Sequence, residues 1–77
     1  MSADNIPTVE TSDGTIRLGQ FLKLANLAGS GAHARELIVS GDVKVQGEFV
    51  TQRGRQLSRG MLVEVVLPGE TLSAYVG

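Results

Sequence analysis

The 77-residue sequence contains no cysteine, one histidine, two prolines and three aromatic side chains. Without cysteine the chain has no disulfide, no cysteine-ligated zinc site and no thiol nucleophile. It also has no Walker loop and no dinucleotide fingerprint. His33 and Ser30 are a conceivable nucleophile–base pair, but Ser30 is already explained as a helix cap. We therefore predict a protein that is not an enzyme, with no metal, no cofactor and no small-molecule substrate.

Long apolar runs are lacking as well, since none exceeds two or three residues and a membrane-spanning helix needs about 20. The N-terminal residues are polar and acidic, unlike a secretory signal peptide. We therefore predict a cytoplasmic protein with no membrane partner.

Charge is distributed unevenly along the chain, whose net charge is only -1. Residues 1–14 carry three acids and no base, whereas residues 15–60 hold all seven bases and have a net charge of +4. Residues 61–77 add two further acids. Because a partner contacts one face rather than the total charge, this distribution predicts a polyanionic partner.

The composition predicts one small domain at residues 15–77, preceded by a flexible acidic leader at residues 1–14. A short edge strand around residues 6–9 is the alternative for the leader. In the first predicted helix, Thr15 is a possible cap and an apolar stripe begins at Leu18, Phe21 and Leu22.

A second helix is predicted from Ser30, a favourable N-cap, to Gly41, which suits a left-handed C-cap. Its apolar face contains Ala34, Leu37 and Ile38.

A short strand follows, in which Val43 and Val45 are expected to face inward and Lys44 and Gln46 outward. Gly47 then predicts the turn of a hairpin. Residues 51–60 are expected to form a basic loop anchored by Leu57, followed by a strand at residues 61–67 and a last strand at residues 72–76. Two helices before the strands favour an α+β domain with helices on one side of a small sheet.

Nucleic-acid binding is the function that the charged residues favour. The amides near Gly31 at the start of the second helix suit a phosphate, and Arg35 and Lys44 add positive charge. Phe21 and Phe49 are expected in the core, so stacking of single-stranded bases is disfavoured. Recognition of folded RNA through its shape and phosphates is favoured instead.

A series of residues keeps a fixed spacing through both helices and the first strand: Arg17-Leu18, Ser30, Ala34-Arg35, Ile38, Gly41, Val43, Val45 and Gly47. This series resembles the S4 RNA-binding domain family over about residues 15–67. The phrase IRLGQFLKLANLAGSG and the later RGR are similar to small stand-alone bacterial S4-like proteins.

The resemblance implies an S4-like (alpha-L) fold, with two N-terminal helices packed on a small, mainly antiparallel β-sheet. It also implies non-enzymatic binding of structured RNA, either ribosomal RNA or tRNA, with the ribosome as a possible partner. Together with the charge pattern it gives the predicted RNA-binding residues: Arg17, Lys23, Ser30, Gly31, His33, Arg35, Lys44, Gln46, Arg53, Arg55 and Arg59. The chain departs from the family pattern at Gly31, where many members carry a base.

Three other functions remain open at this point. A ribosome-associated protein-interaction module would use the basic face for docking only. A ubiquitin-like sulfur carrier is suggested by the strands VKVQGEFV and VEVVLPGE, although such carriers end in a flexible Gly-Gly and this sequence ends in Val76-Gly77. A helix-turn-helix DNA reader would use the two helices and their glycine-containing turn.

Overall fold

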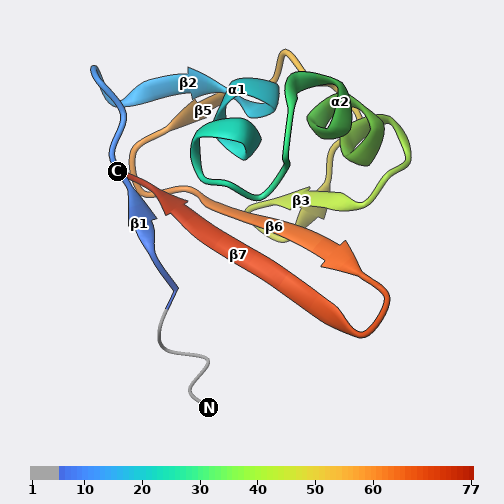
Figure 1. The fold of residues 1–77 in the computed structure, drawn as a ribbon. Coiled ribbons are helices and arrows are strands. Elements are labelled where there is room, and N and C mark those ends of the chain that lie inside the picture. Colours follow the sequence, from blue (N-terminus) through green and yellow to red (C-terminus); the bar gives the residue numbers. More distant parts are fainter. Residues whose placement is uncertain (1–5) are drawn as a thin grey trace.

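The computed structural model describes residues 6–77. Both helices lie on one face of a five-stranded sheet, and a separate two-stranded sheet lies beside the first helix (Figure 1). The elements follow one another as β1 (Thr8–Val9), β2 (Thr15–Arg17), α1 (Leu18–Leu24), α2 (Gly31–Val39), β3 (Val43–Val45), β4 (Glu48–Phe49), β5 (Gln56–Ser58), β6 (Leu62–Leu67) and β7 (Glu70–Val76).

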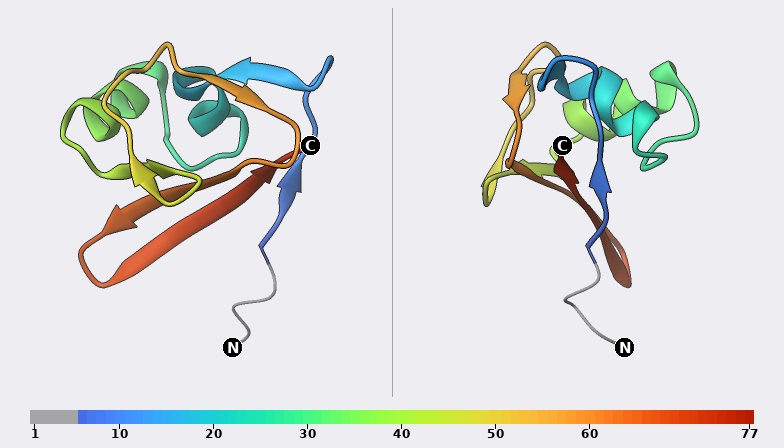
Figure 2. Two further views of the ribbon diagram at one scale, coloured as in Figure 1. Left: turned by 180° about the vertical axis from the view of Figure 1, so that it is seen from behind. Right: turned by 90° about the vertical axis from the view of Figure 1, so that its left-hand side faces the viewer.

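The larger sheet has the strand order β1-β7-β6-β3-β4. Its β7–β6, β6–β3 and β3–β4 pairs are antiparallel, whereas β1 runs parallel to β7. The sheet is therefore mixed, and within residues 6–77 no helix lies on its opposite face (Figure 2). The predicted α+β class is confirmed, but the expected order of elements is wrong because β1 and β2 precede the helices.

The predicted cap of the first helix at Thr15 is also wrong, since this residue lies in β2. Strand β2 pairs antiparallel with β5, and Ile16 lies opposite the fully buried Leu57. Helix α1 therefore begins only at Leu18, after Arg17 in an extended conformation. Thr15 therefore pairs with β5, about 40 residues later in the sequence, and does not cap a helix.

Helix α2 begins and ends as predicted. The Ser30 hydroxyl oxygen accepts a hydrogen bond from the His33 backbone N–H at 3.1 Å, as an N-cap does. After the helix, Gly41 has a φ of 81°, in the left-handed region that favours glycine.

The hairpin of β3 and β4 is confirmed as well. Gln46 was expected in the strand, but β3 ends at Val45. Gln46 and Gly47 instead form the two-residue connection, with φ values of 54° and 84°, as in a type I′ turn. Val43 and Val45 are buried, as expected. The last two strands form a longer hairpin through Pro68-Gly69, and β7 begins two residues earlier than predicted.

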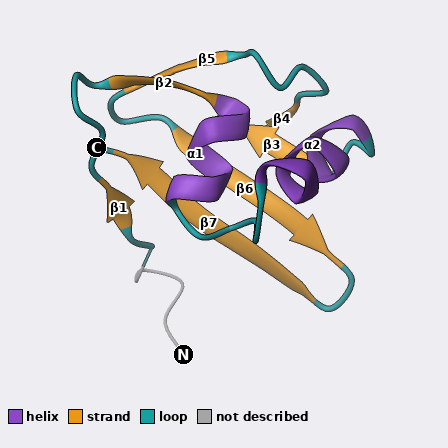
Figure 3. Ribbon diagram, turned by 45° about the horizontal axis from the view of Figure 1, so that its top comes forward, coloured by secondary structure: helices purple, strands orange, loops and turns teal. Residues whose placement is uncertain are grey.

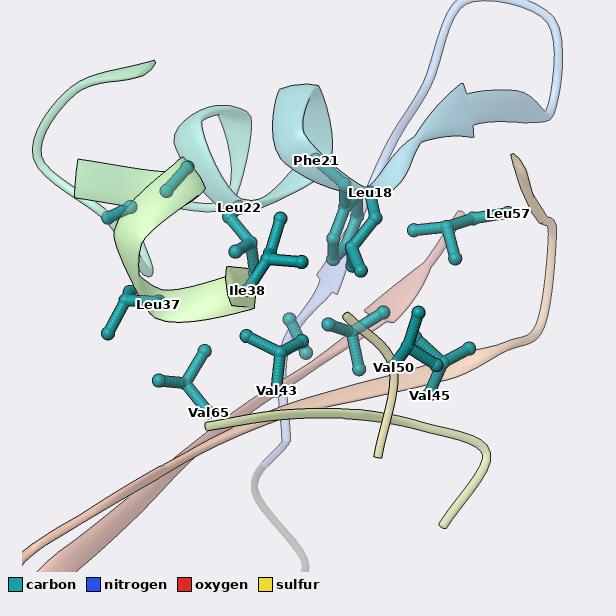
Figure 4. Packing of buried hydrophobic residues seen from close by; sticks show 14 of the residues in the cluster. Leu18, Phe21, Leu22, Leu37, Ile38, Val43, Val45, Val50, Leu57 and Val65 are labelled. Atoms are coloured by element: carbon teal, nitrogen blue, oxygen red, sulfur yellow. The ribbon is translucent and has the colours of Figure 1, made fainter. Parts of the chain in front are cut away.

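The core lies between the helices and the sheet. Leu22 of α1 and Ile38 of α2 point toward Val43 and Val65 of the sheet, and all four are fully buried (Figure 4). Phe49 is not part of this core, contrary to prediction, and 59% of its surface is exposed.

The sheet register explains the exposure of Phe49. Phe49 lies opposite Lys44, which alternates with the inward-facing Val43 and Val45, so Phe49 and Lys44 share the face without helices. The Lys44 ammonium nitrogen lies 5.1 Å from the centre of the Phe49 ring. This distance suits a cation–π contact.

Strand β1 pairs with the end of β7. Strand β1 forms within the segment predicted as a flexible leader, in agreement with the alternative of a short edge strand. Residues 1–5 of the predicted leader lie outside the described residues.

Gly77 is held in the structure. Its N–H donates to the Val9 carbonyl oxygen at 2.8 Å, and its own carbonyl oxygen accepts from the Thr11 hydroxyl at 2.8 Å. A buried and paired Gly77 differs from the mobile tail that a sulfur carrier needs. Over residues 6–77, neither helix has the length and apolar character required to cross a bilayer.

Candidate nucleic-acid interface

The loop between β4 and β5 is fixed to the start of α1 by two backbone hydrogen bonds. The Leu18 N–H donates to the Arg55 carbonyl oxygen at 2.8 Å, and the Gly19 N–H donates to the Arg53 carbonyl oxygen at 3.0 Å. The first amides of a helix lack partners within the helix. The loop satisfies two of them, and this holds the Arg53 backbone beside α1.

A groove of about 340 Å³ opens where this loop meets the two helices. Figure 3 shows how α1, the start of α2 and the β4–β5 loop adjoin one another. The lining residues come from these three segments and from the end of β2: Arg17, Gly19, Gln20, Lys23, Gly31, Arg35, Arg53 and Gly54.

The groove is strongly cationic. Half of its lining residues are bases, and among the described residues no Asp or Glu lines it. Three more lining residues are glycines, which leave the backbone accessible. Like charges gathered around a small concave surface raise the local positive potential and attract anions. The geometry therefore suits a ligand with several negative charges and a main chain that approaches closely, as a sugar–phosphate backbone does.

Five of the predicted RNA-binding residues line this groove: Arg17, Lys23, Gly31, Arg35 and Arg53. They are brought together from positions up to 36 residues apart in the sequence. An ideal Cβ built on Gly31 would meet no atom within 4 Å, so the groove is open at this point.

Ser30 and His33 lie beside the groove and shape the turn before α2. Besides the Ser30 cap, the Gly29 N–H donates to His33 Nδ1 at 3.0 Å. Neither Ser30 nor His33 lines the groove. Their polar atoms are used to fix the start of α2, and this in turn places Gly31.

Lys44 and Gln46 lie elsewhere. Lys44 is on the sheet face without helices, over the Phe49 ring. Gln46 Oε1 accepts a hydrogen bond from the Leu62 N–H at 2.6 Å. The structure thus separates these two predicted residues from the groove.

Arg55 and Arg59 are also outside the groove lining. The predicted loop of residues 51–60 is interrupted by β5, and of its three arginines only Arg53 lines the groove. The guanidinium carbon of Arg59 lies 3.0 Å from the position that a Cβ on Gly14 would take. Arg59 therefore packs against the turn before β2.

Three lining residues were missed by sequence reasoning, namely Gly19, Gln20 and Gly54. A signal for Gln20 was present, since it lies three residues after Arg17 and three before Lys23. Residues three apart on a helix share a face. Gly54 had no such signal, because its position depends on how the loop packs against α1.

The fold and the groove together define a small α+β domain that presents a cationic concave surface beside a helix pair. A family model described as the S4 domain matches residues 9–73. The chain belongs to the S4 domain family, and the resemblance inferred from its residues is confirmed.

Similar proteins fall into two groups. The chain is 35% identical over 60 residues to tyrosine–tRNA ligases of Ralstonia nicotianae and Burkholderia lata; this covers 78% of the chain but only 15% and 14% of those proteins. It is 44% identical over 50 residues to a Bacillus subtilis protein named "Probable ribosome maturation protein RlbA". That match covers 65% of the chain and 70% of the relative.

Proposed function

We propose that this protein binds structured RNA through the groove, with ribosomal RNA as the leading ligand and tRNA as the second. The observation that carries the proposal is the lining itself. Four bases from separate segments surround about 340 Å³, with no described acid among the lining residues. Phosphate contacts provide most of the affinity in such complexes.

Folded RNA fits the groove better than an unpaired strand does. Recognition of single strands depends on aromatic side chains on which nucleobases stack. None of the described residues that line the groove is aromatic. Double-stranded RNA is recognised mainly through its shape, its phosphates and its 2′-hydroxyls. The lysine, arginine and glycine residues that line the groove are suited to such contacts.

The relatives support ribosomal RNA over tRNA. The relative named for ribosome maturation is matched over 70% of its length, whereas the tyrosine–tRNA ligases are matched over about one seventh of theirs. A role in ribosome assembly or function is therefore part of the proposal. Binding alone is proposed, with no chemical step.

The test compares two triple variants with the same charge change. The groove variant carries Lys23→Ala, Arg35→Ala and Arg53→Ala, and the control carries Lys44→Ala, Arg55→Ala and Arg59→Ala. Binding to transcribed ribosomal RNA fragments and to a tRNA transcript is measured by fluorescence anisotropy between 50 and 200 mM salt.

Four phosphate contacts predict that wild-type affinity falls about 50- to 150-fold over this salt range. The groove variant should lose roughly three quarters of that salt dependence, and the control should keep it. If both variants lose the same share of the salt dependence, or if neither loses any, the proposal is overturned.

Duplex DNA as a competitor tests the helix-turn-helix alternative. If the groove variant sediments with ribosomes to the same extent as the wild type, the protein-interaction module is favoured instead.

A further inference from the structure

The side chains around the groove differ in the hydrogen bonds that they can make. Lysine and arginine donate hydrogen bonds and accept none, and glycine has no side chain. One lining residue carries an amide that can both donate and accept, namely Gln20. Among the eight lining residues, it is the only one whose side chain can accept a hydrogen bond from a ligand.

Two backbone acceptors near the groove are already engaged. The Arg53 and Arg55 carbonyl oxygens accept from the first two amides of α1. Gln20 itself is exposed, and within residues 6–77 its side-chain amide has no hydrogen-bond partner. Its amide is therefore available to a ligand in the groove.

The position of Gln20 suits a contact with a sugar. It lies on α1 between Arg17 and Lys23, which are placed to bind phosphates on either side. The preceding residue is Gly19, so no side chain stands between the helix backbone and the loop at this point. In a nucleic-acid strand the ribose is the group between successive phosphates.

We propose that Gln20 hydrogen-bonds a ribose 2′-hydroxyl and makes the groove selective for RNA over DNA. The inference rests on the proposed function of the groove. Phosphate oxygens only accept hydrogen bonds and are chemically the same in RNA and DNA, so a lysine or arginine that contacts only a phosphate does not read the sugar. The 2′-hydroxyl both donates and accepts. The Gln20 amide matches it, with Oε1 as acceptor and Nε2 as donor.

The experiment uses an RNA stem-loop derived from the ribosomal fragment that binds, and the same stem-loop with 2′-fluoro sugars. The fluoro sugars keep the RNA helix geometry and lack the hydroxyl. The wild type should bind the hydroxyl form about fivefold to tenfold more tightly, as one net hydrogen bond predicts. Gln20→Leu should bring the ratio of the two affinities to about one and should keep the salt slope, because no cationic contact is lost. Gln52→Leu, an exposed glutamine outside the groove, should keep the preference.

The outcomes separate this inference from the function of the groove. If Gln20→Leu weakens both probes equally, Gln20 has a structural role and the inference is wrong. If the wild type binds both probes equally and Arg35→Ala weakens both, the groove binds RNA without reading the hydroxyl. If Arg35→Ala changes neither affinity, the proposed groove itself fails. Thermal melting monitored by circular dichroism shows whether each variant is folded.

Discussion

Replacing Gly31 with arginine should convert an open wall of the groove into a fifth cationic contact. Gly31 is the first residue of α2 and lines the groove, and its backbone does not require a positive φ. A Cβ at this position meets nothing within 4 Å. The Cβ of a new side chain at this position therefore displaces no atom.

The magnitude follows from counterion release. One added phosphate contact raises the salt slope by about 0.7–0.9 and the affinity by roughly tenfold at 50 mM salt and about fourfold at 200 mM. The fold should tolerate the change. A base in the first turn of a helix costs about 0.3–1 kcal/mol against the helix dipole. Replacing a glycine that has an ordinary φ regains about 0.4–1 kcal/mol by restricting the unfolded chain.

The assay is a salt titration of RNA binding, with Ala32→Arg as the matched control. Ala32 is the next residue of α2, is exposed, and lines a different cavity with Glu36 and Val39. Both variants add one positive charge to the same helical turn. If Ala32→Arg raises the affinity and the slope as much as Gly31→Arg does, the effect is one of general charge, and the reasoning from the groove is refuted.

Three further predictions concern the supports of the groove and are measured by urea denaturation. Ser30→Ala removes the cap that accepts from the His33 N–H and should lower the free energy of unfolding by about 1 kcal/mol; an unchanged value would argue against the cap. Gly41→Ala forces a side chain into the left-handed region and should cost about 1–2 kcal/mol, whereas Gly29→Ala, with an ordinary φ, should cost less. Leu57→Ala empties a fully buried site and should cost about 2–5 kcal/mol, so a loss below 1 kcal/mol would contradict the packing of β5 on the core.

The parts of the fold that local chemistry specifies were predicted well. Ser30 marks the start of α2 and Gly41 marks its end, because a cap and a left-handed glycine act on the residues next to them. The turn expected at Gly47 is present, although it also includes Gln46, which was expected in the strand. The burial of Val43 and Val45 was also predictable, because alternate residues of a strand face the same side and only one side is buried here.

The predictions that failed depended on partners distant in the sequence. Thr15 has the chemistry of a helix cap, but pairing with Ser58 of β5 placed it in a strand. Phe49 is apolar, but its register opposite Lys44 turned it to the face without helices. Neither the pairing nor the register has a signal within a few residues of the position concerned.

The same division applies to the candidate site. The sequence alone determined which lysine and arginine residues the chain carries and that they lie between residues 15 and 60. It also determined the S4-type spacing of the chain. Tertiary structure decided which bases share a surface. It placed Arg17, Lys23, Arg35 and Arg53 around one groove and left Lys44 and Arg59 elsewhere. The reason is that the first amides of α1 donate hydrogen bonds to the loop at residues 53–55, and such a long-range contact is fixed only when the whole chain packs.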